Sequence, residues 1–451
     1  MRSRTMRRVA ARYLWDRIKV SLWFVPLVMA LAALLLARLM GWLDAQIPDE
    51  VLHNSRFILA GTANEMRTAM IGLAGTILAT AGVVFSLLTL PLSTVAAQFG
   101  SRLLRVFLRD RTTQLVLGTF VGTFTYCILT ALAVPAAELP RADLPQVSVT
   151  VGLILSMATF ASLIILIQHI SMMLQAPIIV KAAGTELMEA IGRERPGEYQ
   201  ETRREYQEYL TKALIDQEAY PLKMTDTGYI QYVDPEIIVN LAKEKDLTLR
   251  LLCLPGQFVG RGETVALVWP AAEVDERLGI QLGRAVQTGN QRTPTQDIEY
   301  AINQLVEVAV RAMSPAINDP FTAMTCLDYL ADGLATYVRH GDSSPNFFDS
   351  DGKLRLIFEP PSPATLLGAA FDMLRHASCD NATVLLSMLD AIDTIGQAAK
   401  PSEVRQELLR HVHLVQNESC TGHLIDADKE RIRLCCETIA LTLNQKFAPT
   451  E

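Results

Sequence analysis

The stretch that decides the fold of this chain runs from Arg67 to Arg102 and reads Arg67-TAMIGLAGTILATAGVVFSLLTLPLSTVAAQFGS-Arg102. The 34 residues between the two arginines carry no charge. Small side chains recur along it at alternating spacings of three and four, which keeps them on one face of a helix. This small-residue stripe consists of Gly72, Gly75, Ala79, Gly82, Ser86, Thr89, Ser93, Ala96 and Gly100. Close contact between helices in lipid depends on small residues, so the stripe predicts tight packing along this helix.

Three other apolar runs accompany this one in the first 180 residues. The four candidate spans are 20–42, 69–97, 114–137 and 148–170. Each is long enough to cross about 30 Å of hydrocarbon as a helix. The sequence therefore predicts an α-helical integral membrane protein with four transmembrane helices.

Basic residues concentrate in two of the short segments that flank these spans. Seven precede the first span: Arg2, Arg4, Arg7, Arg8, Arg12, Arg17 and Lys19. Four lie between the second and third spans: Arg102, Arg105, Arg109 and Arg111. The other two loops are acidic or mixed. By the positive-inside rule, we expect a multi-pass protein of the bacterial inner (plasma) membrane with both termini in the cytoplasm.

Charge and cysteine content limit the partners and the compartment. The net charge of −7 over 451 residues combines a basic membrane-facing half with an acidic soluble half, which argues against a nucleic-acid partner. Six of the seven cysteines lie from Cys253 onwards, and no two form a CxxC pair. We therefore expect free thiols in a reducing cytoplasm.

The remainder of the chain predicts a cytoplasmic α+β region. Its strand-like runs are 229–233, 247–254 and 264–269, with a short helix at 235–244, and their glycine turns resemble the small barrels or sandwiches of biotinyl and lipoyl carrier domains. Helical patterns follow at 294–313, 320–339, 363–377, 380–399, 402–416 and 426–446, and 342–353 reads as a polar loop. The expected domains are a basic N-terminus (1–19), a four-span domain (20–170), a helical connector (171–218) that includes a charged helix at 198–218, a small β-rich domain (219–270) and a helical domain (271–451).

Two polar motifs stand out in the soluble region. In Arg292-Thr-Pro-Thr-Gln-Asp297, a capping box with Thr293 as N-cap and Gln296 at the third position predicts a helix start. In the run from Met313 to Ala323, Asp319 before a proline predicts a second one. Capping leaves several polar side chains unexplained, and they suit a buried polar network or a ligand cradle. The candidate residues are Arg292, Gln296, Asp297, Ser314, Asn318, Asp319 and Thr322.

These motifs also carry a family resemblance. The four-span layout together with Arg-Thr-x-x-Gln-Asp and Ser-Pro-x-Ile-Asn-Asp-Pro-x-Thr-Ala resembles a family of predicted bacterial membrane proteins known as domain of unknown function 2254. The resemblance covers nearly the whole chain. It implies a membrane location and no particular activity.

Metal, cofactor and enzyme sites are not indicated. His411, His413, Cys420 and His423 lie close in sequence, but two histidines two apart on a helix point to different sides and the spacing matches no zinc pattern. No phosphate-binding loop, dinucleotide fingerprint, zinc-protease or nucleophile-elbow motif occurs. We therefore expect neither a cofactor nor a catalytic activity.

The small-residue stripe has two interpretations. In one, it packs within the chain against Gly118-x-x-x-Gly122 and Gly152-x-x-x-Ser156 of the later spans. In the other, copies of the chain associate around an axis, with Thr76, Thr80, Ser86, Thr89 and Ser93 lining a narrow polar path. The second is similar in outline to the Gly/Ala-rich pore helix of small-conductance mechanosensitive channels. In those channels, however, the pore helix directly precedes the soluble domain, whereas two spans intervene here.

The resulting functional hypothesis is an oligomeric ion channel or channel-like assembly with span 69–97 at its central packing or pore face. A membrane-anchored sensor or scaffold without conduction is the alternative, and a transporter subunit is a second one. A transporter usually carries acidic or basic residues inside its spans, and they are nearly absent here. The two are His169, near the end of the fourth span, and Arg38, which can snorkel outwards. The expected partners are the lipid bilayer, further copies of the chain, and a small ligand or protein at the cytoplasmic domain.

Overall fold

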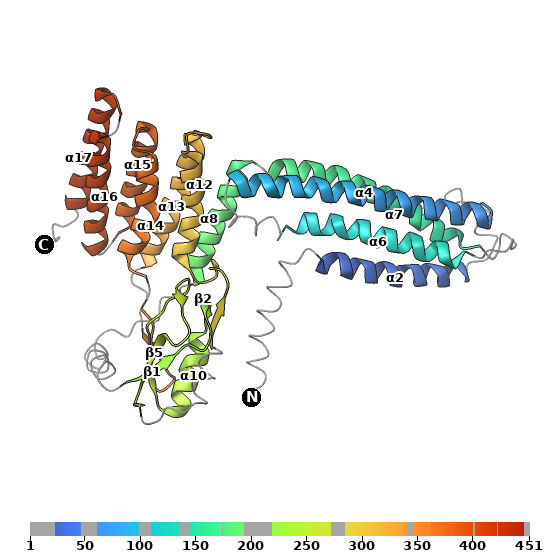
Figure 1. The fold of residues 1–451 in the computed structure, drawn as a ribbon, viewed down its shortest axis with the longest axis horizontal. Helices are drawn as coiled ribbons and strands as arrows, with labels where there is room; N and C mark the ends of the chain where they lie inside the picture. Colours follow the sequence, from blue (N-terminus) through green and yellow to red (C-terminus); the bar gives the residue numbers. More distant parts are fainter. Residues whose placement is uncertain are drawn as a thin grey trace. The chain divides into compact units, whose positions relative to one another are not determined.

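The computed structural model is mostly helical, with a mixed sheet region (Figure 1). It describes residues 23–46, 61–98, 110–134, 144–173, 175–193, 219–271, 285–340, 346–359, 361–399, 402–421 and 423–445. The predictions for the basic N-terminus, for the charged helix 198–218 and for the arginines between 102 and 109 lie outside the described residues. The chain divides into two compact units, Met1–Ile178 and Ile179–Glu451.

The first unit contains four helices that are long and apolar enough to span a membrane. They are α2 (Phe24–Asp44), α4 (Ala63–Gln98), α6 (Arg111–Ala133) and α7 (Gln146–Met173). Each overlaps a span expected from the sequence. Helix α6 contacts α2, α4 and α7 and is the most buried of the four, so it is the central helix of this unit (Figure 1).

Small and hydroxyl side chains hold α6 against its neighbours. A Cβ atom added at Gly118 would lie 2.2 Å from the sulfur of Met29 in α2, so that glycine permits the close approach. Towards α7, the hydroxyls of Thr123 and Thr159 are 2.8 Å apart, and the Tyr126 hydroxyl donates to the Ser148 carbonyl at 2.9 Å. Close packing and hydrogen bonds of this kind associate helices in an apolar medium.

Two carboxylates cap helix N-termini in this unit: one caps α7 itself, and the other caps α6 beside the C-terminal end of α7. At its N-terminus, Asp44 of α2 accepts hydrogen bonds from the backbone N–H groups of Val147 at 2.8 Å and Ser148 at 3.0 Å. At the other end, Asp110 caps α6 through the Thr113 N–H at 2.6 Å and lies 3.0 Å from Nε2 of His169 in α7. Both carboxylates complement the positive end of a helix dipole.

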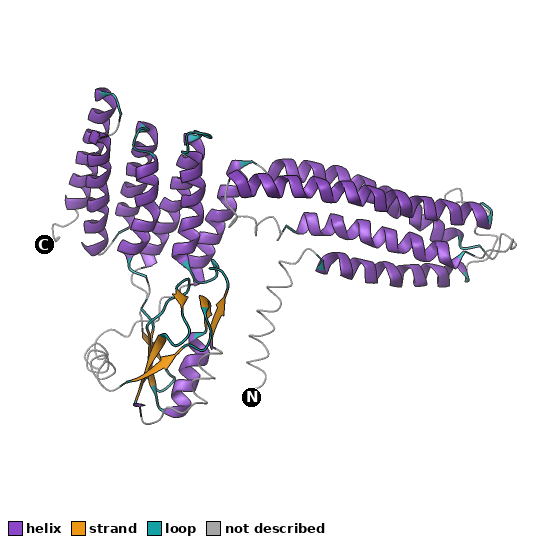
Figure 2. Cartoon of the chain, viewed as in Figure 1, coloured by secondary structure: helices purple, strands orange, loops and turns teal. Residues whose placement is uncertain are grey.

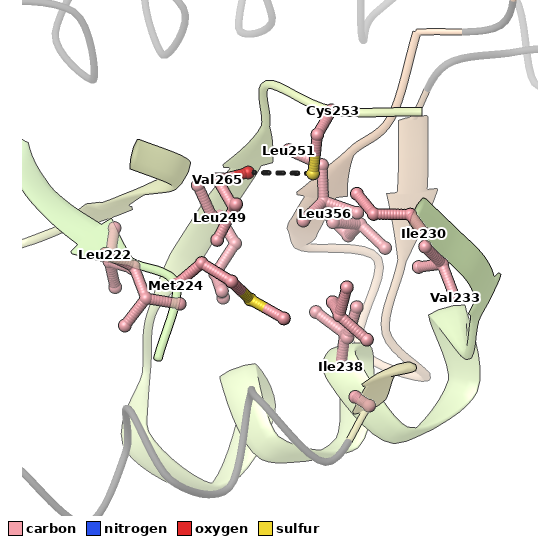
Figure 3. Packing of buried hydrophobic residues seen from close by; sticks show 14 of the residues in the cluster. Leu222, Met224, Ile230, Val233, Ile238, Leu249, Leu251, Cys253, Val265 and Leu356 are labelled. Carbon is pink, nitrogen blue, oxygen red and sulfur yellow. Dashed lines mark hydrogen bonds between the residues drawn. The ribbon is translucent and has the colours of Figure 1, made fainter. Parts of the chain in front are cut away.

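In the second unit, eight described strands form two sheets. They are β1 (Tyr220–Lys223), β2 (Gly228–Val233), β3 (Thr248–Leu251), β4 (Phe258–Val259), β5 (Thr264–Trp269), β6 (Val286–Gly289), β7 (Asn346–Phe348) and β8 (Leu354–Ile357). The orders are β1-β5-β3-β8-β7 and β4-β2-β6, with only β3 and β8 parallel. Helix α10 (Pro235–Lys245), capped by Asp234 as expected, contributes Ile238 and Ala242 to their common apolar core (Figure 3).

Two predictions for this region are corrected. The β-rich part does not end at residue 270, because β6, β7 and β8 come from later in the chain. The segment 342–353, expected to be a polar loop, contains β7 and leads into β8, which extends the larger sheet beside β3. Among the described strands, no pairing joins the two sheets into a closed barrel.

The remaining helices are α8 (Ala176–Arg193), α12 (Ile298–Ala312), α13 (Pro320–His340), α14 (Pro363–Ala377), α15 (Ala382–Ala398), α16 (Ser402–Thr421) and α17 (Asp426–Gln445). The last six form a stack of hairpins. Helices α12, α14 and α16 contact one another in sequence order, as do α13, α15 and α17, which gives two layers. The turns that join α12 to α13, α14 to α15 and α16 to α17 lie at one edge of the stack (Figure 2). All six helices expected here are present.

Candidate functional site

The small-residue stripe lies on the outward face of α4. All of its members up to Ser93 are exposed, namely Gly72, Gly75, Ala79, Gly82, Ser86, Thr89 and Ser93. The buried face carries Met66, Met70, Ala74, Ile77 and Val84. At about 100° per residue, this set lies on the opposite side of the helix from the stripe.

No described residue of the chain covers the stripe. A Cβ atom added at Gly72, Gly75 or Gly82 would meet no neighbouring atom within 4 Å. The glycines offered as intrachain partners are engaged elsewhere: Gly118 contacts Met29, and Gly152 contacts Met70 on the buried face of α4. The intrachain interpretation of these three α4 glycines is therefore wrong for the part of the chain that the structure describes.

The hydroxyls of this helix are satisfied by its own backbone. Thr76 donates to the Gly72 carbonyl at 2.9 Å, Thr80 to the Thr76 carbonyl at 2.8 Å, and Ser86 to the Gly82 carbonyl at 3.2 Å. The proton of each hydroxyl is therefore already used in a hydrogen bond. Only the oxygen lone pairs remain available to a neighbour.

A ridge of large side chains borders the stripe, a feature that the sequence analysis did not single out. Ile71, Leu78 and Phe85 are exposed and seven residues apart. With Val83 on the other side, they turn the stripe into a shallow groove. The heptad spacing was the available signal, although an apolar span masks it because nearly every position is apolar.

In the first polar motif, Arg292 and Asp297 form a two-bond ion pair. The arginine Nε lies 2.7 Å from Asp297 Oδ2 and its Nη2 lies 2.8 Å from Oδ1. Asp297 is buried and caps α12 by accepting from the Tyr300 N–H at 2.9 Å. Burial raises the pKa of the Asp297 carboxyl above its usual value, and the bonds from Arg292 oppose that rise. The predicted cap at Thr293 is wrong, because the helix begins after Asp297.

Gln296 connects this motif to a strand. Its amide accepts from the Val233 N–H at 2.8 Å and donates to the Val233 carbonyl at 2.9 Å. It therefore extends the hydrogen bonding of β2 and is not part of a capping box. The Arg-Thr-x-x-Gln-Asp motif thus joins the strands to the helical stack, and its polar groups bind protein rather than facing an open cradle.

The second motif builds the turn between α12 and α13. The Asn318 N–H donates to the Ser314 carbonyl at 2.9 Å, and Asn318 adopts a left-handed φ of 49°. Asp319 caps α13 as expected, accepting from the Thr322 N–H at 3.1 Å and from its hydroxyl at 2.5 Å. Asn318 is exposed, so the hypothesis that it closes a buried polar corner is wrong.

The same turn displays two apolar residues to solvent. Ile317 and Phe321 are both exposed, and Phe321 is 76% exposed. The sequence analysis did not name either residue as a candidate site residue, because apolar residues beside a helix start suggest core positions. The motif therefore builds a hydrogen-bonded turn with an apolar tip.

Elsewhere the described residues offer little for a ligand. No group of three or more potential metal ligands is brought together among them. His411 is fully buried, and burial followed by the charge of Arg410 lowers its pKa to about 4. A cavity of about 20 Å³ in the β core, beside Met224 and Ile238, has room for one water rather than an organic ligand.

Comparison with known proteins agrees with the motif resemblance. Residues 19–394 match the family model described as predicted membrane protein (DUF2254). Two similar proteins are described as uncharacterized, Rv1290c of Mycobacterium tuberculosis and Mb1321c of Mycobacterium bovis, each 29% identical over 346 residues. The alignment covers 76% of this chain and 66% of each relative, so the chain spans just under two thirds of their length. No solved structure matches. The chain belongs to the DUF2254 family of predicted membrane proteins.

Proposed function

We propose that this protein is embedded in the bacterial inner membrane, with both termini in the cytoplasm, and self-associates through α4 into a channel-like assembly. The observation that carries the proposal is the uncovered small-residue stripe, on which Gly72, Gly75 and Gly82 meet no described atom of their own chain. A glycine-lined face of a membrane helix gains contact only when another helix approaches closely.

The ridge supports association of copies in a ring. Ile71, Leu78 and Phe85 lie beside the groove on the same helix, so the ridge of one copy can enter the groove of the next. Such a contact joins two different surfaces, and repeating it closes a ring when the rotation allows. The hydroxyls of Thr76 and Ser86 also lie on the exposed part of this helix with oxygen lone pairs available, and such oxygens suit a cation where they are not covered by the next copy.

The test compares two glycines. Gly82 in α4 and Gly41 in α2 are both exposed and without neighbours within 4 Å among the described residues. Gly82→Leu fills the groove and should reduce the mass of the assembly in detergent to that of a monomer, whereas Gly41→Leu should leave it unchanged. A monomeric wild-type protein, or equal loss in both variants, would contradict association through α4.

Conduction is tested separately by ion flux into liposomes. Ser86→Asp should shift the preference further towards cations, because an acidic ring attracts them. An intact oligomer that passes no ion at any voltage or membrane tension would favour the second candidate, a membrane-anchored scaffold. The hairpin stack supports that candidate, since stacked helix pairs provide extended binding surfaces in other proteins.

A further inference from the structure

We propose that the contact between α6 and α7 is a proton path through a single copy of the protein. It runs along a row of buried hydroxyl groups between Asp44 and the pair formed by Asp110 and His169, all within the first unit. From Asp110 to Thr130, α6 rises about 30 Å, which is the thickness of the hydrocarbon layer. This inference rests on the membrane insertion proposed above, but not on assembly through α4.

Polar side chains from the two helices meet in pairs along this contact. In order, the pairs are Thr119 with Ser162, Thr123 with Thr159, and Cys127 with Ser156. The oxygens of the first two pairs are 3.2 Å and 2.8 Å apart, and the sulfur of the third lies 3.8 Å from its partner oxygen. Successive pairs are about one helical turn apart, or roughly 5–6 Å, a distance that one water molecule can bridge.

This row distinguishes α7 from the other neighbours of α6. Towards α2, Gly118 and Gly122 lie against Met29, and towards α4, Phe120 packs in an apolar cluster that includes Met70. Small residues and apolar packing are enough to associate helices in lipid. A polar row at one contact out of three therefore calls for a use besides holding the helices together.

At the end of the row nearest Asp44, one hydroxyl is left over. The Tyr126 hydroxyl donates to the Ser148 carbonyl at 2.9 Å, and the Ser148 hydroxyl donates to Asp44. Thr130 lies one turn beyond Tyr126 on the same helix and is 3% exposed, and its hydroxyl has no hydrogen-bond partner among the described residues. A buried hydroxyl without a partner calls for a water molecule. Thr130 is therefore the point at which water from the Asp44 end reaches the row.

At the other end, an apolar side chain interrupts the row. Nε2 of His169 lies 3.0 Å from Asp110 Oδ1 but makes no hydrogen bond with any described residue, so it is available to take a proton. His169 is about 10 Å from Ser162 along α7. Leu166 lies between them and is fully buried. Leu166 is therefore the barrier that water must pass before a proton reaches His169.

The spacing of the paired oxygens selects the proton over a metal ion. Two oxygens that hold an ion between them must be at least about 4 Å apart, since even the small Mg²⁺ keeps its oxygen ligands at about 2 Å. The oxygens of Thr123 and Thr159 are 2.8 Å apart, and only a proton fits between them.

The transfer is a relay without net chemical change. Each hydroxyl takes a proton on an oxygen lone pair and gives its own proton to the next group, so one proton enters at Asp44 for each one released at His169. The hydroxyls then rotate back to the carbonyls of their own helix, to which Thr159 and Ser156 both donate at 2.8 Å in the structure.

Two threonines of α6 provide a matched pair for the test. Thr123 is buried in the row, whereas Thr125 lies on the opposite side of the helix and donates to the Val121 carbonyl. The full-length protein is reconstituted in liposomes that contain a pH-sensitive dye, and a potassium gradient with valinomycin drives protons inwards. Thr123→Val, which keeps the shape and removes the hydroxyl, should lower the proton flux several-fold. Thr125→Val and Thr123→Ser should retain it.

A gain of flux provides the second measurement. Leu166→Ser supplies a hydroxyl at the barrier and should raise the flux several-fold above that of Leu166→Ala, which opens the same space without one. A row that only holds the helices together predicts no such gain. Gly82→Leu should retain the proton flux even as a monomer, because the path lies inside one copy.

Other outcomes decide against the path. Equal flux in the two valine variants, or no flux in both the wild-type protein and Leu166→Ser, would leave the row as packing alone. Loss of proton flux in Gly82→Leu would place conduction at the α4 assembly instead. A protein that does not incorporate into liposomes would contradict membrane insertion itself, and this inference with it.

Discussion

The carboxylate of Asp297 occupies the space where residue 256 would carry a side chain. A Cβ atom at Gly256 would lie 1.9 Å from Asp297 Oδ2, and Gly256 has a φ of +91°. Its N–H donates to the Ile230 carbonyl at 2.7 Å, which fixes the loop against β2. A glycine in the β region thus makes room for the residue that caps α12, so the strands and the helices of the second unit depend on each other for their geometry.

Gly256→Ala should therefore destabilise the protein more than Gly262→Ala. Both glycines have a positive φ, but a Cβ at Gly262 (φ +82°) meets no described atom within 4 Å. Gly262→Ala should cost about 1 kcal/mol from backbone strain alone. Gly256→Ala should cost roughly 2 kcal/mol more, because it must displace the Asp297 carboxylate from Arg292. Denaturant unfolding of the purified full-length variants measures the difference, and equal losses would show that the contact carries no energy.

The turn at Asn318 should depend on backbone conformation rather than on its amide. Asn318→Gly should change the free energy of unfolding little, since glycine adopts a positive φ freely, whereas Asn318→Val should cost about 1–2 kcal/mol. Asp319→Ala should cost about 1 kcal/mol through loss of the cap. The same unfolding measurement applies. A large loss in Asn318→Gly would mean that the amide itself makes an essential bond.

Acid should destabilise the helical stack through His411. Its pKa is lowered to about 4 in the folded state, against about 6.5 in an unfolded chain, so the unfolded state binds the proton first as pH falls. The stability is full above pH 6.5 and declines between about pH 6.5 and pH 4, by an amount on the order of a few kcal/mol. The charged groups that act on the pKa of the ring are Arg410, Asp372, Glu407 and Arg375.

His411→Gln should flatten this pH dependence of unfolding, whereas His413→Gln, at an exposed position on the same helix, should preserve it. Melting temperatures between pH 4 and pH 7.5 give the comparison. If the His411 variant loses stability with the same slope as the wild-type protein, another group is responsible.

The proposed topology predicts which thiols an impermeant reagent reaches in intact cells. A cysteine replacing Asn54, between α2 and α4, should react from outside, and one replacing Ser350, between β7 and β8, should not. Cys420 supplies an internal control, because it is exposed and should react only after lysis. Labelling of Cys420 in intact cells, or protection of the cysteine at 54, would contradict the proposed orientation.

The sequence alone determined the features that depend on neighbours along the chain. The length of the uncharged run from Arg67 predicted α4, and Asp234 and Asp319 predicted the starts of α10 and α13, because apolar content and capping act within a few residues. The same local patterns located the helices of the hairpin stack to within a few residues at most ends.

Only the tertiary structure decided which surfaces are covered. The period of the stripe on α4 could not reveal that Met70 and Ile77 face the neighbouring helices while Gly75 and Gly82 face outwards, because in an apolar helix every face is equally fit for lipid. Thr293 satisfied the local rule for a cap, yet Asp297 caps α12, because Gln296 pairs with Val233, 63 residues earlier in the chain. Such contacts depend on where distant strands meet, and no local pattern records that.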